Sequence, residues 1–145
     1  MPFLINLSML LFVALSIAYS GCGDNTSAYV IKPPPVPPGY GVFYAAPQGG
    51  SIMWKKDPRA ILWDQAVVPL DVVRVGIVNG VIFGIHEDPK TKAQTGFYVD
   101  TNSHAVTLNV PVAELNERLK SVFAITNFDT VPARFYAENV DGGPR

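Results

Sequence analysis

The chain has 145 residues, 48% of them hydrophobic, and a formal net charge of −1 at pH 7. Near-neutral charge argues against nucleic-acid binding, which demands a basic footprint, and against attachment to an anionic lipid surface by charge alone. The length allows a single domain, and one cysteine leaves no intramolecular disulfide, so an apolar core has to stabilise the fold.

A long uncharged apolar run lies close to the N-terminus. It covers Phe3–Tyr19 and is followed by Ser20, Gly21 and Cys22, the single cysteine. The run has the length of the apolar part of a secretory signal and is short for a membrane-spanning helix, which needs about 20 residues. The sequence Tyr19-Ser20-Gly21-Cys22 resembles the lipobox of bacterial lipoproteins, in which small residues precede a cysteine that becomes lipidated.

The resemblance implies a cellular location. Residues 1–21 would be a signal peptide that is removed, and Cys22 would carry acyl chains that hold the protein at the cell membrane. Gly23 stands where lipoproteins retained at the inner membrane of enterobacteria have Asp, so in a Gram-negative host the resemblance implies the outer membrane. Two other interpretations of the apolar run stay open: an uncleaved membrane anchor and an ordinary secretory signal.

Residues 22–39 are expected to form a tether. In Pro33–Pro38, five of six residues are proline. Such a run favours extended polyproline II, which rises about 3.1 Å per residue and acts as a stiff spacer. We therefore expect the tether to hold the domain away from the membrane. Proline-rich segments also bind aromatic grooves, and that role stays open.

Residues 40–137 are predicted to form one small domain that begins with strands. Gly41–Ala45 and Ser51–Lys55 flank the turn-forming segment Pro47–Gly50, which indicates a hairpin. Ala60–Trp63 is a further short apolar run, and Val67–Val68 predicts an extension of the sheet up to Pro69.

The clearest local signal is Asn79-Gly80 between two β-branched runs, Val72–Val78 and Val81–His86. Both turn residues tolerate the positive φ of a type I′ turn, so the pattern predicts a tight hairpin. A further hairpin is expected from Gly96–Thr101 and Ala105–Val110. Successive hairpins indicate an antiparallel meander.

One helix is predicted after Pro111, a residue that is tolerated in a first helical turn. Its apolar stripe has helical spacing and consists of Val112, Leu115, Leu119, Val122 and Phe123. Glu114 and Arg118 form a favourable i,i+4 pair on the polar face. Phe135-Tyr136 is expected to dock, and residues 138–145 to form a flexible tail. The predicted fold is α+β: an antiparallel meander sheet with one amphipathic helix packed on it.

The order of these elements over residues 61–119 resembles the C-terminal portion of small bacterial lipoproteins of unassigned function. The resemblance rests on a hairpin with Asn79-Gly80, a charged loop, a further strand pair and an amphipathic helix. It implies the same α+β architecture and assigns no functional residue.

The side chains that could carry chemistry are few. His86 and His104 are the only histidines, and neither has a partner at a recognised catalytic or metal spacing. His86, Glu87 and Asp88 form the best ligand-type cluster, but neighbouring strand residues alternate faces and do not converge on one ion. Asp100 precedes a turn and is expected to bind main-chain groups there. We therefore expect no catalytic, cofactor or metal site.

Five aromatic residues could line a ligand groove, although ordinary packing in the core is favoured; they are Tyr40, Phe43, Tyr44, Trp54 and Trp63. The preferred interpretation is a lipid-anchored, non-enzymatic domain that binds an envelope protein or a cell-wall component. The alternative is an envelope hydrolase or an inhibitor of one. An enzyme is expected to bring titratable groups together in a cleft, whereas an interaction domain exposes an unpaired strand edge or an apolar patch.

Overall fold

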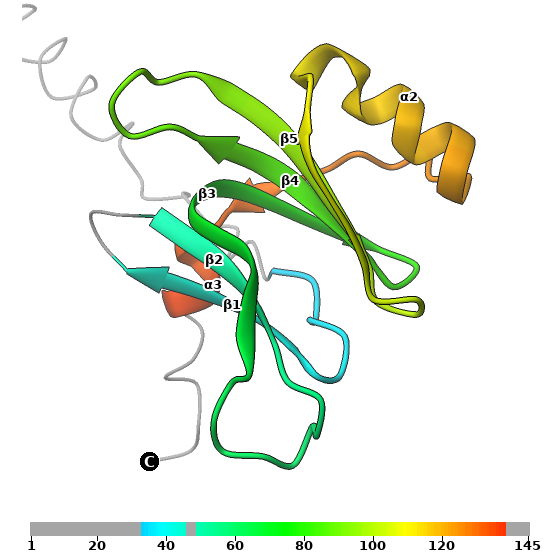
Figure 1. The fold of residues 1–145 in the computed structure, drawn as a ribbon. Helices are drawn as coiled ribbons and strands as arrows, with labels where there is room; N and C mark the ends of the chain where they lie inside the picture. Colours follow the sequence, from blue (N-terminus) through cyan, green and yellow to red (C-terminus); the bar gives the residue numbers. More distant parts are fainter. Residues whose placement is uncertain (1–32, 46–48, 139–145) are drawn as a thin grey trace, which may run out of the picture. The chain divides into compact units, whose positions relative to one another are not determined.

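The computed structural model describes residues 33–45 and 49–138. Their strands are β1 (Tyr40–Ala45), β2 (Gly49–Trp54), β3 (Gln65–Val78), β4 (Val81–Glu87), β5 (Gln94–Asp100), β6 (Ala105–Val110) and β7 (Val131–Pro132) (Figure 1). Their helices are α2 (Val112–Phe123) and α3 (Arg134–Glu138). The strands form one antiparallel seven-stranded sheet in the order β1-β2-β3-β4-β5-β6, with β7 added beside β3. This confirms the predicted α+β meander with a helix packed on it.

Several predictions concern residues that lie outside the described part of the chain. They are the signal peptide 1–21, the lipidated Cys22, the first part of the tether up to residue 32, and the tail from residue 139. Within the described ranges, no helix is both long enough and apolar enough to cross a membrane.

The predicted hairpins are confirmed, and local backbone geometry explains why. Asn79 and Gly80 have φ angles of 51° and 77°, the positive values that a type I′ turn requires at both positions. Val78 faces Val81 across this turn. The β1–β2 and β5–β6 pairs also form as expected.

Strand β3 is longer than the sequence pattern indicated. It continues through Pro69, because β2 pairs with its first half and β4 with its second half. Pro69 has no cross-strand partner and lies where the register with β2 shifts, so its missing N–H breaks no ladder. Asp71 follows with a φ of 83°. The segment Ala60–Trp63, by contrast, lies in the β2–β3 loop and not in the sheet.

A bulge in β3 changes which valines face the core. The register with β4 shifts between Val72 and Arg74, so two residues of β3 oppose one of β4. As a result Val72 and Val75 are both fully buried, while Val73 is only partly buried. Simple alternation along a regular strand would place Val73 on the same face as Val75, and the bulge breaks this alternation.

Two apolar clusters cover the two faces of the sheet. The main core contains Tyr40, Val42, Ile52, Val68, Val72, Val75, Ile82, Phe97, Val99, Ala133 and Tyr136. The helix core contains Val81, Phe83, Val110, Leu115, Leu119 and Ile125. Neighbouring residues of β4 alternate between them, since Ile82 belongs to the main core and Phe83 to the helix core.

Helix α2 buries a narrower stripe than predicted. Leu115 and Leu119 are its buried residues, whereas Val112 and Val122 are 42% and 59% exposed. Leu115 packs onto Gly96 of β5, where an added Cβ would stand 3.1 Å from the leucine methyl groups. A side chain on Gly96 would therefore push the helix away from the sheet.

The C-terminal segment returns to the first half of the sheet. Strand β7 pairs with β3, and the N–H of Ala133 donates to the carbonyl of Val73 at 3.0 Å. Helix α3 follows and lies beside β1 (Figure 1). It places the ring of Tyr136 in the main core, which confirms the predicted docking of this aromatic residue.

The tether does not stand wholly clear of the domain. Val36, the one non-proline residue of the run, is partly buried against the main core. The N–H of Tyr40 donates to the carbonyl of Pro37 at 3.1 Å. The last residues of the expected spacer are thus part of the packed structure.

Candidate functional site

Strand β1 forms one edge of the sheet, and its main chain shows which groups face outward. The N–H of Lys55 donates to the carbonyl of Gly39 at 2.9 Å, so the polar groups of Gly39 point toward β2. Alternate residues of an antiparallel strand point their main-chain groups to the same side. The N–H and C=O groups of Val42 and Tyr44 therefore point away from β2. Within the described ranges, no strand pairs with them.

An apolar groove of about 540 Å³ follows this edge. Its lining residues are Val36, Tyr40, Gly41, Val42, Phe43, Tyr44, Trp63, Tyr136 and Ala137. Both faces of β1 contribute to the groove, because consecutive residues of a strand point to opposite faces. The outer edge of β1 thus forms the floor of the groove. Val36 and α3 form its wall on the main-core side.

The second wall is aromatic and is assembled from two parts of the chain. Phe43 of β1 and Trp63 of the β2–β3 loop meet edge to face, with ring centroids 5.1 Å apart and an interplanar angle of 80°. Gly41 makes room for this contact, since a Cβ there would come within 2.7 Å of the Trp63 ring. Phe43 remains 44% exposed, which leaves its ring available to a ligand.

The groove carries no charge. None of its lining residues is acidic or basic. Burial raises the pKa of Tyr136 to about 12, and burial together with the charge of Asp100 raises the pKa of Tyr40. Both phenols therefore stay neutral at physiological pH. The Nζ of Lys55 lies over the Trp63 ring, 4.7 Å from its centroid.

His104 supports the groove from the end of the sheet. Its Nδ1 and the Oη of Tyr40 share a hydrogen bond of 2.6 Å. Its ring also lies 5.5 Å from that of Trp54. Trp54 does not line the groove, so the five-residue aromatic set is only partly correct.

The two histidines lie at opposite ends of the sheet. At one end Val81 pairs with Asp100, directly before the turn that holds His104. At the other end His86 pairs with Thr95. His86 lies five positions after Val81 along β4, which corresponds to about 17 Å at about 3.3 Å per residue. The two imidazoles therefore do not form an acid–base pair.

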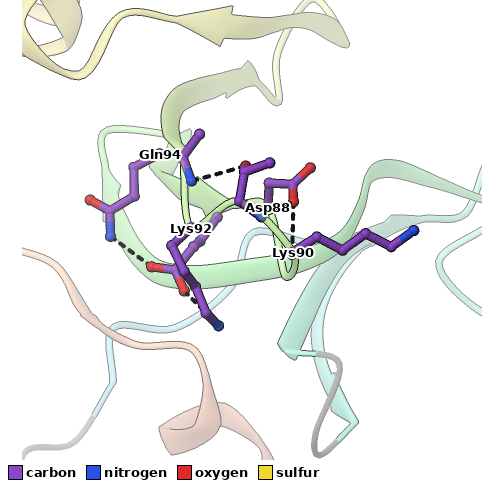
Figure 2. Close-up of polar contacts among 7 residues, drawn as sticks. Asp88, Lys90, Lys92 and Gln94 are labelled. Atoms are coloured by element: carbon purple, nitrogen blue, oxygen red, sulfur yellow. Dashed lines mark hydrogen bonds and ion pairs between the residues drawn. The ribbon is translucent and has the colours of Figure 1, made fainter.

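The carboxylates beside His86 have other partners (Figure 2). Glu87 accepts a hydrogen bond from Gln94 at 2.9 Å and pairs with Lys92 at 3.6 Å. Asp88 accepts from the main-chain N–H groups of Lys90 and Thr91, both at 2.8 Å, and these bonds lower its pKa. The two side chains stabilise the β4–β5 loop.

Asp100 performs the turn role that the sequence predicted. Its carboxylate accepts from the Oγ of Ser103 at 2.7 Å and from the N–H of Asn102 at 3.0 Å. The hydrogen bond from Ser103 is the largest cause of a lowered pKa. The side chain thus fixes the β5–β6 turn.

A smaller hollow of about 260 Å³ contains charges of both signs, contributed by Asp71, Glu87, Lys92 and Arg134. Glu87 and Lys92 are the ion pair described above, and neither histidine lines this hollow. The groove beside β1 is about twice as large, is mainly apolar and has no charged residue in its lining. It is the candidate site.

The sequence named four residues of this groove, Tyr40, Phe43, Tyr44 and Trp63, among its candidate aromatics. It did not assign Val36 or Tyr136 to it, although the docking of Tyr136 was expected. Searches with this chain against protein-family models, curated proteins and solved structures find no match.

Proposed function

We propose that this protein is a non-enzymatic binding domain that takes an extended apolar segment of an envelope protein as an added strand beside β1. The observation that supports this most is the coincidence of the outward-facing edge of β1 with the floor of the apolar groove. Strand addition combines main-chain hydrogen bonds with pockets for alternate side chains, and the groove offers both.

The geometry defines the partner's chemistry. An added strand pairs with the main chain of Val42 and Tyr44, and its side chains alternate between two walls. One set faces Val36 and Tyr136, and the other faces Phe43. The partner segment is therefore extended, carries apolar or aromatic residues on both faces, and has no proline at the positions that pair.

The two edges of the sheet differ in a way that favours β1. Edge strands are commonly protected by bulges, charges or prolines. Strand β6, the opposite edge, is bulged between the Gly96 and Tyr98 pairings, with Asn109 at a φ of 57°. Strand β1 has regular pairing over Tyr40–Ala45 and no charged residue. It is the edge that offers a regular template.

The test compares two variants of Tyr44. Tyr44→Ala removes the ring and keeps the outward N–H, whereas Tyr44→Pro removes both. A peptide selected from a library of extended apolar segments is titrated against each variant by fluorescence anisotropy. Tyr44→Pro loses one main-chain hydrogen bond, and its ring blocks the approach of the peptide. Its affinity for the peptide should therefore be about tenfold weaker than that of Tyr44→Ala. Equal affinities would show that the peptide does not bind as a strand.

We further propose that the domain is displayed at the cell envelope by lipid on Cys22. The support is the small-residue pair before this cysteine and the apolar run Phe3–Tyr19. Cys22→Ala should leave the precursor uncleaved and without label from radioactive palmitate. If the variant is cut and released normally, the lipid anchor is wrong and an ordinary secretory signal takes its place. Outer-membrane location in a Gram-negative host is read from membrane fractionation.

A further inference from the structure

The loop between β2 and β3, residues 55–64, displays the two most exposed large hydrophobic residues of the described chain. Ile61 is 94% exposed and its neighbour Leu62 is 80% exposed. The next in rank, Val122 on α2, is 59% exposed. Two adjacent aliphatic side chains with this exposure are unusual on a soluble surface and mark a contact site.

Hydrogen bonds hold the loop in this form. The N–H of Ala60 donates to the carbonyl of Asp57 at 3.0 Å, and the N–H of Asp64 donates to the carbonyl of Trp54 at 3.0 Å. The Nζ of Lys55 donates to the carbonyl of Ala60 at 2.7 Å, directly before the apolar pair. These hydrogen bonds close the base of the loop and support the segment directly before Ile61. They therefore hold the exposed tip in a defined position.

The loop carries a small excess of positive charge, with Lys55, Lys56 and Arg59 against Asp57 and Asp64. Its two carboxylates are directed at main-chain groups, since Asp57 accepts from the N–H of Arg59 at 2.9 Å and Asp64 accepts from the N–H of Lys56. Both Lys56 and Arg59 are exposed, and neither forms an ion pair within the described residues. Two exposed cations therefore precede the apolar tip in the loop.

The loop lies at the end of the sheet where β1 begins. Lys55, the first residue of the loop, is hydrogen-bonded to Gly39, the residue before β1. The loop projects beyond the sheet at the bottom of Figure 1, below the start of β1. The apolar run Phe3–Tyr19 and Cys22 precede the described part of the chain in sequence. A membrane attachment through either feature keeps the domain, and with it this loop, close to a bilayer.

We propose that loop 55–64 inserts its tip into a lipid bilayer. Ile61 and Leu62 enter the boundary between headgroups and acyl chains, while Lys56 and Arg59 remain at the level of the lipid phosphates. The net charge of −1 does not recruit the protein, so the apolar tip provides the contact and the two cations add to it. The loop orients the groove beside β1 relative to the membrane. The inference does not depend on strand addition, because Ile61 and Leu62 do not line the groove.

Trp63, which follows the tip directly, is a built-in reporter. The full chain is reconstituted into anionic vesicles whose lipids carry bromine on their acyl chains, and tryptophan emission is compared with that in unbrominated vesicles. We expect quenching that disappears in Trp63→Phe. The double variant Ile61→Ser/Leu62→Ser should lose the quenching while the protein still sediments with the vesicles. Val122→Ser, the matched control on α2, should retain it.

Further variants and vesicle compositions in the same quenching experiment distinguish the possible results. Lys56→Gln/Arg59→Gln should reduce quenching in anionic vesicles and leave it unchanged in zwitterionic ones; equal loss in both would contradict the role given to the cations. Wild-type emission that is equal in brominated and unbrominated vesicles would overturn the insertion. Quenching that persists in Ile61→Ser/Leu62→Ser would overturn it as well. Peptide binding by Tyr44→Ala and Tyr44→Pro is unaffected by either result, so failure here and failure of the proposed function are distinguishable.

Discussion

Tyr136 joins a buried ring to a hydroxyl that has no hydrogen-bond partner within the described residues. Such an unsatisfied buried group costs about 1–3 kcal/mol. We predict that Tyr136→Phe keeps or raises the free energy of unfolding, measured by urea denaturation. Tyr136→Ala, the control, should lower it by about 3–5 kcal/mol through the cavity it leaves. A clear loss in Tyr136→Phe would show that the hydroxyl is satisfied in solution.

Asp100 makes stability depend on pH in a definite direction. Hydrogen bonds from Ser103 and Asn102 lower its pKa in the folded state. The stabilisation is therefore complete above the unfolded pKa of about 3.9 and is lost as the pH falls through the lower folded value. Asp100→Asn should be less stable than wild type near neutral pH, and the difference should shrink in acid. Urea midpoints across this range measure it.

Ser103→Ala provides the companion test for Asp100. It removes the largest cause of the lowered pKa and should reproduce most of the change in pH dependence. If the wild type and Asp100→Asn differ by the same amount at every pH, the carboxylate does not stabilise the turn through its charged form.

The β3–β4 hairpin depends on Gly80, whose φ of 77° strains any residue with a branched side chain. Gly80→Val should lower the free energy of unfolding by at least about 1 kcal/mol. Gly80→Asn is the matched control, because Asn tolerates the left-handed conformation and should cost much less. Equal urea midpoints for the two variants would mean that this turn does not constrain the register of β3 and β4.

At the scale of the whole molecule, the contact between the tether and the main core shortens the free spacer. Val36 packs against the main core, whereas Pro35 is exposed. Val36→Ala should lower the free energy of unfolding by about 0.5–1.5 kcal/mol through lost apolar burial. Pro35→Ala, one position away, should leave it nearly unchanged. Identical thermal midpoints for both variants would show that residues 33–39 form a spacer and no part of the core.

The sequence by itself determined those parts of the fold whose causes are local. Asn79-Gly80 predicts its hairpin because turn conformation depends on the residues in the turn. The helix 112–123 and the turn role of Asp100 were predictable for the same reason, since spacing and side-chain-to-backbone bonds act within a few residues. The membrane location implied by Cys22 also rests on residues that are neighbours in the sequence, and it stays a prediction.

Only the tertiary structure decided where the strands continue and which apolar residues are exposed. Strand β3 passes Pro69 because β2 and β4 pair with different halves of it, a fact that no local pattern records. Ile61 and Leu62 belong to a short apolar run of the sequence, yet they are the most exposed of the large hydrophobic residues described.

The groove beside β1 shows the limit of sequence analysis most clearly. It joins Val36, strand β1, Trp63 and helix α3, and its first and last lining residues, Val36 and Ala137, lie 101 positions apart (137 − 36). For each aromatic residue by itself, ordinary core packing was the favoured explanation. Their meeting at an edge depends on long-range strand pairing and on the return of α3 to β1, so periodicity and composition could not reveal it.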